Sequence, residues 1–84
     1  MADKSYVDIE LVTPATIAGA ETKSLRMREP TVADQIAADQ IKGSDAEKEV
    51  AYMANLCEVS PDDLRGLTLR NYRKVQEAFV GFTE

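Results

Sequence analysis

The sequence predicts an α+β fold in which an N-terminal β-hairpin packs on a bundle of three to four short α-helices. Apolar and polar residues alternate through two segments near the N-terminus, as in half-buried strands. From residue 31 onward the apolar spacing becomes helical, and Ser or Thr precedes each helical stretch. We expect a single domain over residues 1–84, with the hairpin in 5–28 and the helical part in 31–84.

The first strand is predicted over residues 6–12, where apolar residues alternate with Asp8 and Glu10. We expect Thr13-Pro14 to end this strand, and a long loop containing Gly19 to follow it. A two-stranded ribbon is marginally stable by itself, so its apolar face must rest on helices. The hairpin residues predicted to share that face are Val7, Ile9, Leu11, Leu25 and Met27.

The second strand is predicted over residues 22–28 and turns two arginines outward. Arg26 and Arg28 alternate with apolar residues, and Asp8 and Glu10 are available as their cross-strand partners. The same arginines could instead form a docking patch, and the sequence leaves both interpretations open.

The first helix is predicted over residues 32–42, because Thr31 and Asp34 resemble a capping box and Pro30 lies just outside it. Its apolar stripe is narrow and rich in alanine, which suits close packing on the hairpin. That stripe consists of Val32, Ala33, Ile36, Ala37 and Ile41.

Three further helices follow. Gly43 is expected to stop the first helix, and Ser44 with Glu47 forms a capping box for a central packing helix over residues 45–57. Ser60-Pro61 starts a short third helix that ends near Gly66, and the last helix covers 69–82. The apolar stripe of the central helix is Val50, Met53, Ala54 and Cys57, and the wider one of the last helix is Leu69, Tyr72, Val75, Gln76, Phe79 and Val80.

The residue inventory argues against an enzyme. The chain has no histidine, so the usual general base and the common triads and zinc-hydrolase sites cannot be assembled. Asp62 and Asp63 suit the first turn of a helix, where the macrodipole favours acidic residues. The single cysteine, Cys57, is predicted to be a small buried apolar residue. We therefore expect no catalytic residues, no metal site and no cofactor.

Charge and hydropathy indicate protein partners. The formal charge of −5 repels nucleic acids and anionic membranes, and the longest apolar runs are far too short to cross a bilayer. The single cysteine cannot form an internal disulfide, and the polar N-terminal residues do not have the pattern of a signal peptide. We therefore expect the protein to be located in a reducing cytoplasm.

A helix-turn-helix regulator is the main alternative. Ala54 and Leu64 have about the spacing of that motif, and basic residues gather in the last helix. However, Glu58 occupies the turn position where glycine is preferred, and Asp62 and Asp63 would start the recognition helix.

The ordered pieces Arg28-Glu29-Pro30-Thr31, Ser60-Pro61-Asp62-Asp63-Leu64 and Leu67-Thr68-Leu69-Arg70-Asn71-Tyr72 resemble the phage tail assembly chaperone family of Mu-like and P2-like contractile-tailed phages. The resemblance covers about residues 5–84. Asn71 departs from the resemblance, since we expect an acidic residue at that position of the family pattern.

This resemblance implies a protein without enzymatic activity that binds the long tape-measure protein in the host bacterial cytoplasm. It would keep that aggregation-prone chain soluble until tail-tube subunits replace it, and it would be absent from the mature virion. A minor structural protein of the virion remains an alternative.

Apolar side chains left over from the core are the predicted partner-binding residues, since amphipathic helices dock into grooves through anchors at helical spacing. The competing interpretation is that these side chains pack in the protein's own core or form a homo-oligomer contact. They are Tyr72, Phe79, Val80 and Phe82 of the last helix, with Ile36 and Ile41 of the first helix as a second surface.

Overall fold

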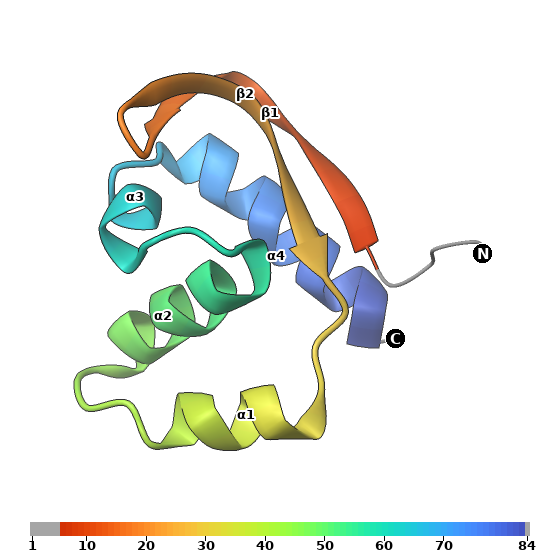
Figure 1. The fold of residues 1–84 in the computed structure, drawn as a ribbon, viewed down its shortest axis with the longest axis vertical. Coiled ribbons are helices and arrows are strands. Elements are labelled where there is room, and N and C mark those ends of the chain that lie inside the picture. The colour runs from red at the N-terminus through yellow and green to blue at the C-terminus, as the bar shows by residue number, and fades with distance from the viewer. Residues whose placement is uncertain (1–5, 84) are drawn as a thin grey trace.

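The computed structural model describes residues 6–83, and within them an antiparallel β-hairpin is followed by four helices. The predicted α+β class is confirmed, and Figure 1 shows the hairpin arching over one end of the helical part. Residue 5, where the hairpin was predicted to begin, and Glu84 lie outside the described residues. The elements are β1 (Tyr6–Ile17), β2 (Ala20–Arg28), α1 (Val32–Asp39), α2 (Asp45–Cys57), α3 (Pro61–Arg65) and α4 (Leu69–Thr83).

The prediction that Thr13-Pro14 ends the first strand and opens a long loop is wrong. β1 continues to Ile17, and Ala18-Gly19 alone connect it to β2. Both turn residues have positive φ, 53° and 82°, as a type I′ hairpin turn requires. Pro14 is tolerated because the strand register shifts between Glu10 and Ala15, so the ladder does not need an N–H at that position.

The inner face of the hairpin follows the predicted alternation with one exception. Ile9, Leu25 and Met27 are buried and Leu11 is half-buried. Val7, however, is 37% exposed. It lies near the open end of the ribbon, where its neighbour Tyr6 is also exposed. The extended β1 adds Ile17 to the core.

Only one of the two predicted cross-strand charge pairs forms. Asp8 lies opposite Arg26, with 3.1 Å between Oδ1 and Nε, and this pair is exposed. Glu10 lies opposite Ser24, so the expected pairing of Glu10 with an arginine is wrong. Arg28 turns away from the strand and binds a carboxylate on α1.

α1 differs from its prediction in length and in orientation. It ends at Asp39 rather than residue 42, because the N–H of Gln40 already closes the last turn onto Ala37. It packs mainly on α2 rather than on the hairpin. Its predicted apolar stripe faces solvent, with Val32 74% and Ile36 54% exposed, while Asp34 is the buried residue of the helix.

α2 is the central helix, as predicted, and begins and ends at the predicted residues. It packs against α1, α3 and the second strand, and α4 runs beside the first strand. Three of its four stripe residues are buried and Val50 is half-buried. The buried apolar core consists of Ile9, Ile17, Leu25, Met27, Met53, Ala54, Leu56, Cys57, Leu64 and Val75.

Candidate partner-binding site

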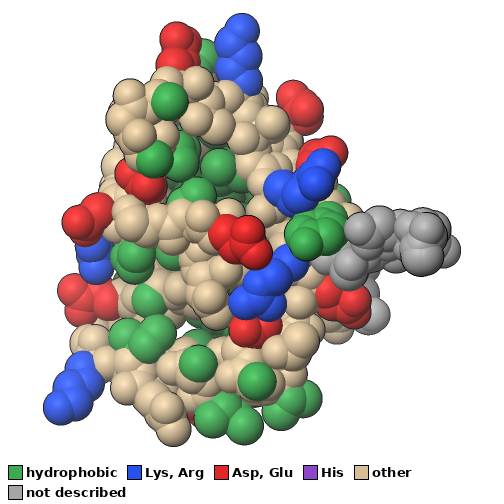
Figure 2. All heavy atoms as spheres, viewed as in Figure 1, with side chains coloured by type: hydrophobic (Ala, Val, Ile, Leu, Met, Phe, Trp, Pro, Cys, Tyr) green, Lys and Arg blue, Asp and Glu red, His purple; other side chains and the backbone are tan. Residues whose placement is uncertain are grey.

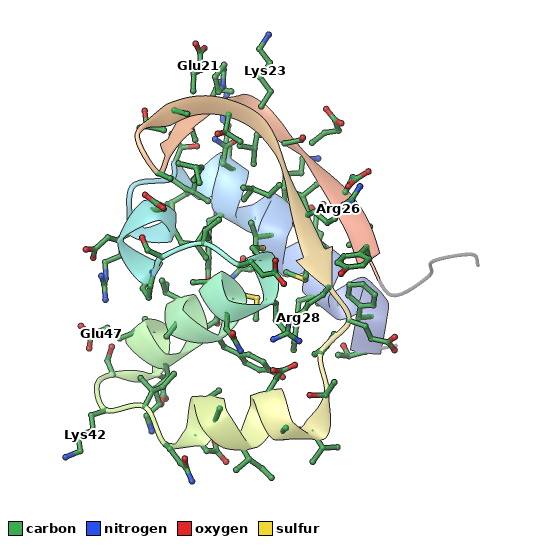
Figure 3. The ribbon with its side chains drawn as sticks, in the orientation of Figure 1. Glu21, Lys23, Arg26, Arg28, Lys42 and Glu47 are labelled. Atoms are coloured by element: carbon green, nitrogen blue, oxygen red, sulfur yellow. The ribbon has the colours of Figure 1, made fainter. Side chains whose placement is uncertain are left out.

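Asp34 joins β2 to α1 through charge-assisted hydrogen bonds. Arg28 donates two of them, 2.7 Å to Oδ2 and 2.9 Å to Oδ1, which is the bidentate geometry of a strong Arg–carboxylate pair. The Thr31 N–H donates a third at 2.9 Å, and the Thr31 hydroxyl accepts from the N–H of Asp34, which completes the capping box. Figure 3 shows Arg28 directed under the end of β2 toward the helices, whereas Arg26 points outward.

The same carboxylate reaches α2. Asn55 donates from Nδ2 to Asp34 Oδ1 at 3.3 Å, so this one side chain of α1 binds residues of β2, of α2 and of the connection between β2 and α1. Hydrogen bonds from Arg28 and Thr31 hold the pKa of Asp34 well below its usual range, although burial opposes this shift. The contact that orients α1 is therefore largely polar, which leaves the large apolar side chains of α1 free to face outward.

A second polar cluster holds α4 beside α2. The Glu49 carboxylate accepts hydrogen bonds from the Tyr72 hydroxyl and from Gln76 Nε2, both at 2.8 Å. Burial raises the pKa of Tyr72, and the hydrogen bond to Glu49 and its negative charge raise it further. The phenol therefore stays protonated and acts as a hydrogen-bond donor.

An open groove, here called the helix groove, lies between α1 and the C-terminal half of α4. Its volume is about 530 Å³. Tyr52 and Phe79 meet edge to face in it, with ring centroids 5.4 Å apart and ring planes at 69°. A second hollow of about 420 Å³ shares both rings and extends past Val32 to Thr83. The remaining residues of the helix groove are Gln35, Ala38 and Asp39 of α1, Lys48, Glu49 and Met53 of α2, and Gln76 and Val80 of α4.

The structure places the six predicted partner-binding residues in different surroundings. Phe79 and Val80 line the helix groove, and Val80 is 50% exposed. Tyr72 lies next to the groove through its bond to Glu49. Phe82 is half-buried and packs on the core. The remaining two lie outside the groove lining, with Ile36 exposed and Ile41 half-buried.

Sequence reasoning missed Tyr52, which lines both hollows together with Phe79. It precedes Met53 and lies beside the predicted stripe of α2, so periodicity alone assigns it to the margin of the core. The available signal was its type, since a tyrosine at the edge of an amphipathic stripe suits a surface that is apolar on one side and wet on the other.

The structural role of Asn71 was also missed, because the sequence shows only that this residue lies in the first turn of the last helix. It is 1% exposed, and its side chain serves the irregular part of β1. Oδ1 accepts from the N–H groups of Val12 at 2.8 Å and Thr13 at 3.2 Å, and Nδ2 donates to the Thr13 carbonyl at 2.9 Å. An asparagine can both accept and donate here, whereas an ionised acidic side chain could only accept.

The geometry does not favour the helix-turn-helix alternative. α3, the helix after the turn, has five residues and buries its Leu64. Its N-terminal turn carries Asp62 and Asp63, and Asp63 accepts a hydrogen bond from the N–H of Ala18 at 3.2 Å. A recognition helix must present its N-terminal residues to base edges, and this one presents acids and lies against the hairpin turn.

Other site types find little support in the described part of the chain. Cys57 is buried, and burial raises the pKa of its thiol to about 11, which suppresses the reactive thiolate. Between residues 6 and 83 there is no cluster of three or more His, Cys, Asp or Glu residues arranged to hold a metal ion. None of the helices over the same residues has the length and apolar character that a membrane crossing requires.

Comparison with known proteins agrees with the resemblance seen in the sequence. A family model described as phage tail assembly chaperone proteins, E, or 41 or 14, matches residues 8–84. Neither the curated proteins nor the solved structures gave a significant match. The match spans both strands and all four helices described above, apart from the first two residues of β1. The chain therefore belongs to the phage tail assembly chaperone family.

Proposed function

We propose that this protein binds the tape-measure protein of its phage and keeps it soluble while the tail is assembled. The observation that carries the proposal is the helix groove, an open hollow with the aromatic rings of Tyr52 and Phe79 in it. A surface of this kind suits an amphipathic helix, whose apolar side chains enter a groove at helical spacing.

Membership in the family supplies the context of tail assembly. A tape-measure protein is long and helical, so several copies of a small chaperone can bind along it, and binding at several points adds avidity. Tail-tube subunits would then displace the chaperone, which makes the tail-tube protein a second candidate partner. In this proposal the protein acts in the host cytoplasm without catalysis and is absent from mature virions.

Co-expression tests the proposal. The long tape-measure product of the same tail gene cluster is expressed alone, with this protein, or with an unrelated acidic protein of similar size as control. We expect the soluble fraction of the long product to rise with this protein and to stay unchanged with the control. An unchanged soluble fraction with this protein would contradict the proposal.

Purified tails provide a second measurement. Quantitative mass spectrometry of finished particles should show far less of this protein than of the tail-tube subunit. A fixed stoichiometric amount in finished tails would instead support the minor structural protein.

A further inference from the structure

We infer that the helix groove recognises a two-turn amphipathic segment whose apolar stripe is flanked by Lys or Arg on the side facing α1 and α2. This inference rests on the proposed function and specifies which surface is used and which chemistry it selects. The partner is thus a basic amphipathic helix, rather than any exposed apolar chain.

The length of the groove sets the length of the segment. The helix groove and the second hollow share Gln35, Tyr52 and Phe79, and together they follow α1 from Val32 to Asp39. At about 1.5 Å per residue, these eight residues give a wall of about 12 Å. A docked helix of that length presents two turns, with apolar anchors at positions i, i+3 or i+4, and i+7. Tyr52, Phe79 and Val80 offer these anchors apolar contact area.

The distribution of charge around the groove indicates the sign of the charges that flank the apolar stripe of the bound segment. Residues 32–58, which contain α1, α2 and their connection, carry six acidic and two basic residues. Asp34 is buried and paired with Arg28, so five acidic residues remain for a partner. Asp39 and Glu49 bring this acidic excess to the groove itself, opposed there by Lys48. In α4, by contrast, basic residues outnumber Glu77. Complementary charge steers association and fixes orientation, so basic residues of the partner should lie over α1 and α2.

The two exposed apolar side chains of α1 and α4 give a matched pair for testing. Val80 is 50% exposed and lines the groove, whereas Ile36 is 54% exposed and lies outside it. Because both are β-branched and at surface positions of helices, replacing either by glutamine should leave the fold intact, which circular dichroism and urea unfolding can verify.

Peptide binding measures the recognised chemistry directly. Two fluorescent helical peptides share a leucine stripe and differ only in carrying Lys or Glu on its flanks, and binding is followed by fluorescence anisotropy at low salt. We expect the Lys peptide to bind about tenfold more tightly than the Glu peptide. Val80→Gln should weaken Lys-peptide binding by about fivefold to tenfold, and Ile36→Gln should leave it unchanged. Asp39→Lys should reduce the preference between the two peptides.

Equal binding of both peptides would overturn the proposed charge preference. If Ile36→Gln weakened binding and Val80→Gln did not, the helix groove would not be the binding surface. Co-expression separates these failures from that of the proposed function. If the wild-type chain and Val80→Gln solubilise the tape-measure product equally well, the helix groove is not the binding site, but the chaperone role stands. If the wild-type chain has no effect, the chaperone role itself fails.

Discussion

Asp34 connects the strand part of the molecule to the helical part through a single carboxylate. The Glu29-Pro30-Thr31 connection directs the chain out of β2, and the bonds from Arg28 and Thr31 then fix the start of α1. A buried carboxylate with a bidentate arginine is strongly oriented, but removing one partner leaves the other charge without compensation. The junction is therefore sensitive to substitution on either side.

Asp34→Asn should lower the free energy of unfolding by about 2 to 3 kcal/mol at pH 7, because the amide loses the ion pair and forces a donor toward Arg28. Urea unfolding measures this change. Asp39→Asn, at an exposed position on the same helix, is the control and should change stability by less than about 0.5 kcal/mol. Equal effects of the two substitutions would mean that the junction contributes nothing specific.

The pH dependence of the free energy of unfolding follows from the lowered pKa of Asp34. Because the folded-state pKa lies below the unfolded value of about 3.9, the stabilisation is fully present above that pH and is lost as the pH falls toward the folded value. The wild-type protein should lose more stability than Asp34→Asn between pH 5 and about pH 3. Parallel curves for the two proteins would contradict this assignment.

Cys57 should resist alkylation in the native state, since it is buried and its thiol has a pKa of about 11. At pH 8 only about one thiolate in a thousand is present even before access is considered. We expect modification by iodoacetamide to become fast only in denaturant. Ala46→Cys, at an exposed position of α2, supplies a matched thiol that should react quickly under native conditions. Rapid modification of the native wild-type protein would show that α2 is not packed as described.

Among the elements, β1 shows most clearly which part of a strand sequence periodicity can predict. Alternation identifies the strand as far as residue 12, and the ladder is regular from Tyr6 to Glu10. Beyond it, Pro14 breaks the pattern, and only the side chain of Asn71, far along the chain, shows why the strand continues. A local pattern cannot reveal a hydrogen bond between residues separated by 58 or 59 positions.

Asn71→Leu should destabilise the protein by about 2 to 4 kcal/mol, since it leaves two part-buried N–H groups and one carbonyl of β1 without their partners. Hydrogen exchange should increase at Val12 and Thr13 before the rest of the hairpin. Leu69→Ala, at a position 73% exposed in the same turn of α4, is the control and should have little effect on either quantity. Unchanged exchange at Val12 and Thr13 would show that Asn71 does not hold β1.

α1 illustrates a different limit. Its N-terminal cap is a local property and was predicted correctly, together with Asp34 as the capping partner. Which face of the helix turns inward was left open, because the apolar stripe could pack on the hairpin or offer Ile36 to a partner. In the structure Arg28 and Asn55 draw Asp34 inward, and Ile36 stays exposed. Two strong polar contacts thus overrode a narrow apolar stripe.

At the scale of the whole molecule, apolar side chains remain exposed on several elements around an acidic body. Figure 2 shows such side chains along α1 at the lower edge of the view, with acidic groups spread over the neighbouring surface. This combination disfavours polyanions and permits contact with basic amphipathic chains.

The net charge of −5 and the acidic first turn of α3 predict that the purified protein passes through a duplex-DNA column at low salt. A regulator would instead be retained in a salt-sensitive and sequence-dependent manner, and Arg70→Ala or Arg73→Ala would abolish retention. Electrophoretic mobility shifts with random and genomic duplexes check the same point in solution. Sequence-dependent retention would revive the helix-turn-helix alternative.

The sequence by itself determined the α+β class, the N-terminal caps of α1, α2 and α3, the buried stripe of α2 and the resemblance to the chaperone family, because each depends on spacing and residue type over short stretches. The tertiary structure decided the length of β1, the orientation of α1 and the grouping of Tyr52, Phe79 and Val80 into the helix groove. These features depend on contacts between distant segments, and such contacts exist only once the core has brought α1, α2 and α4 together.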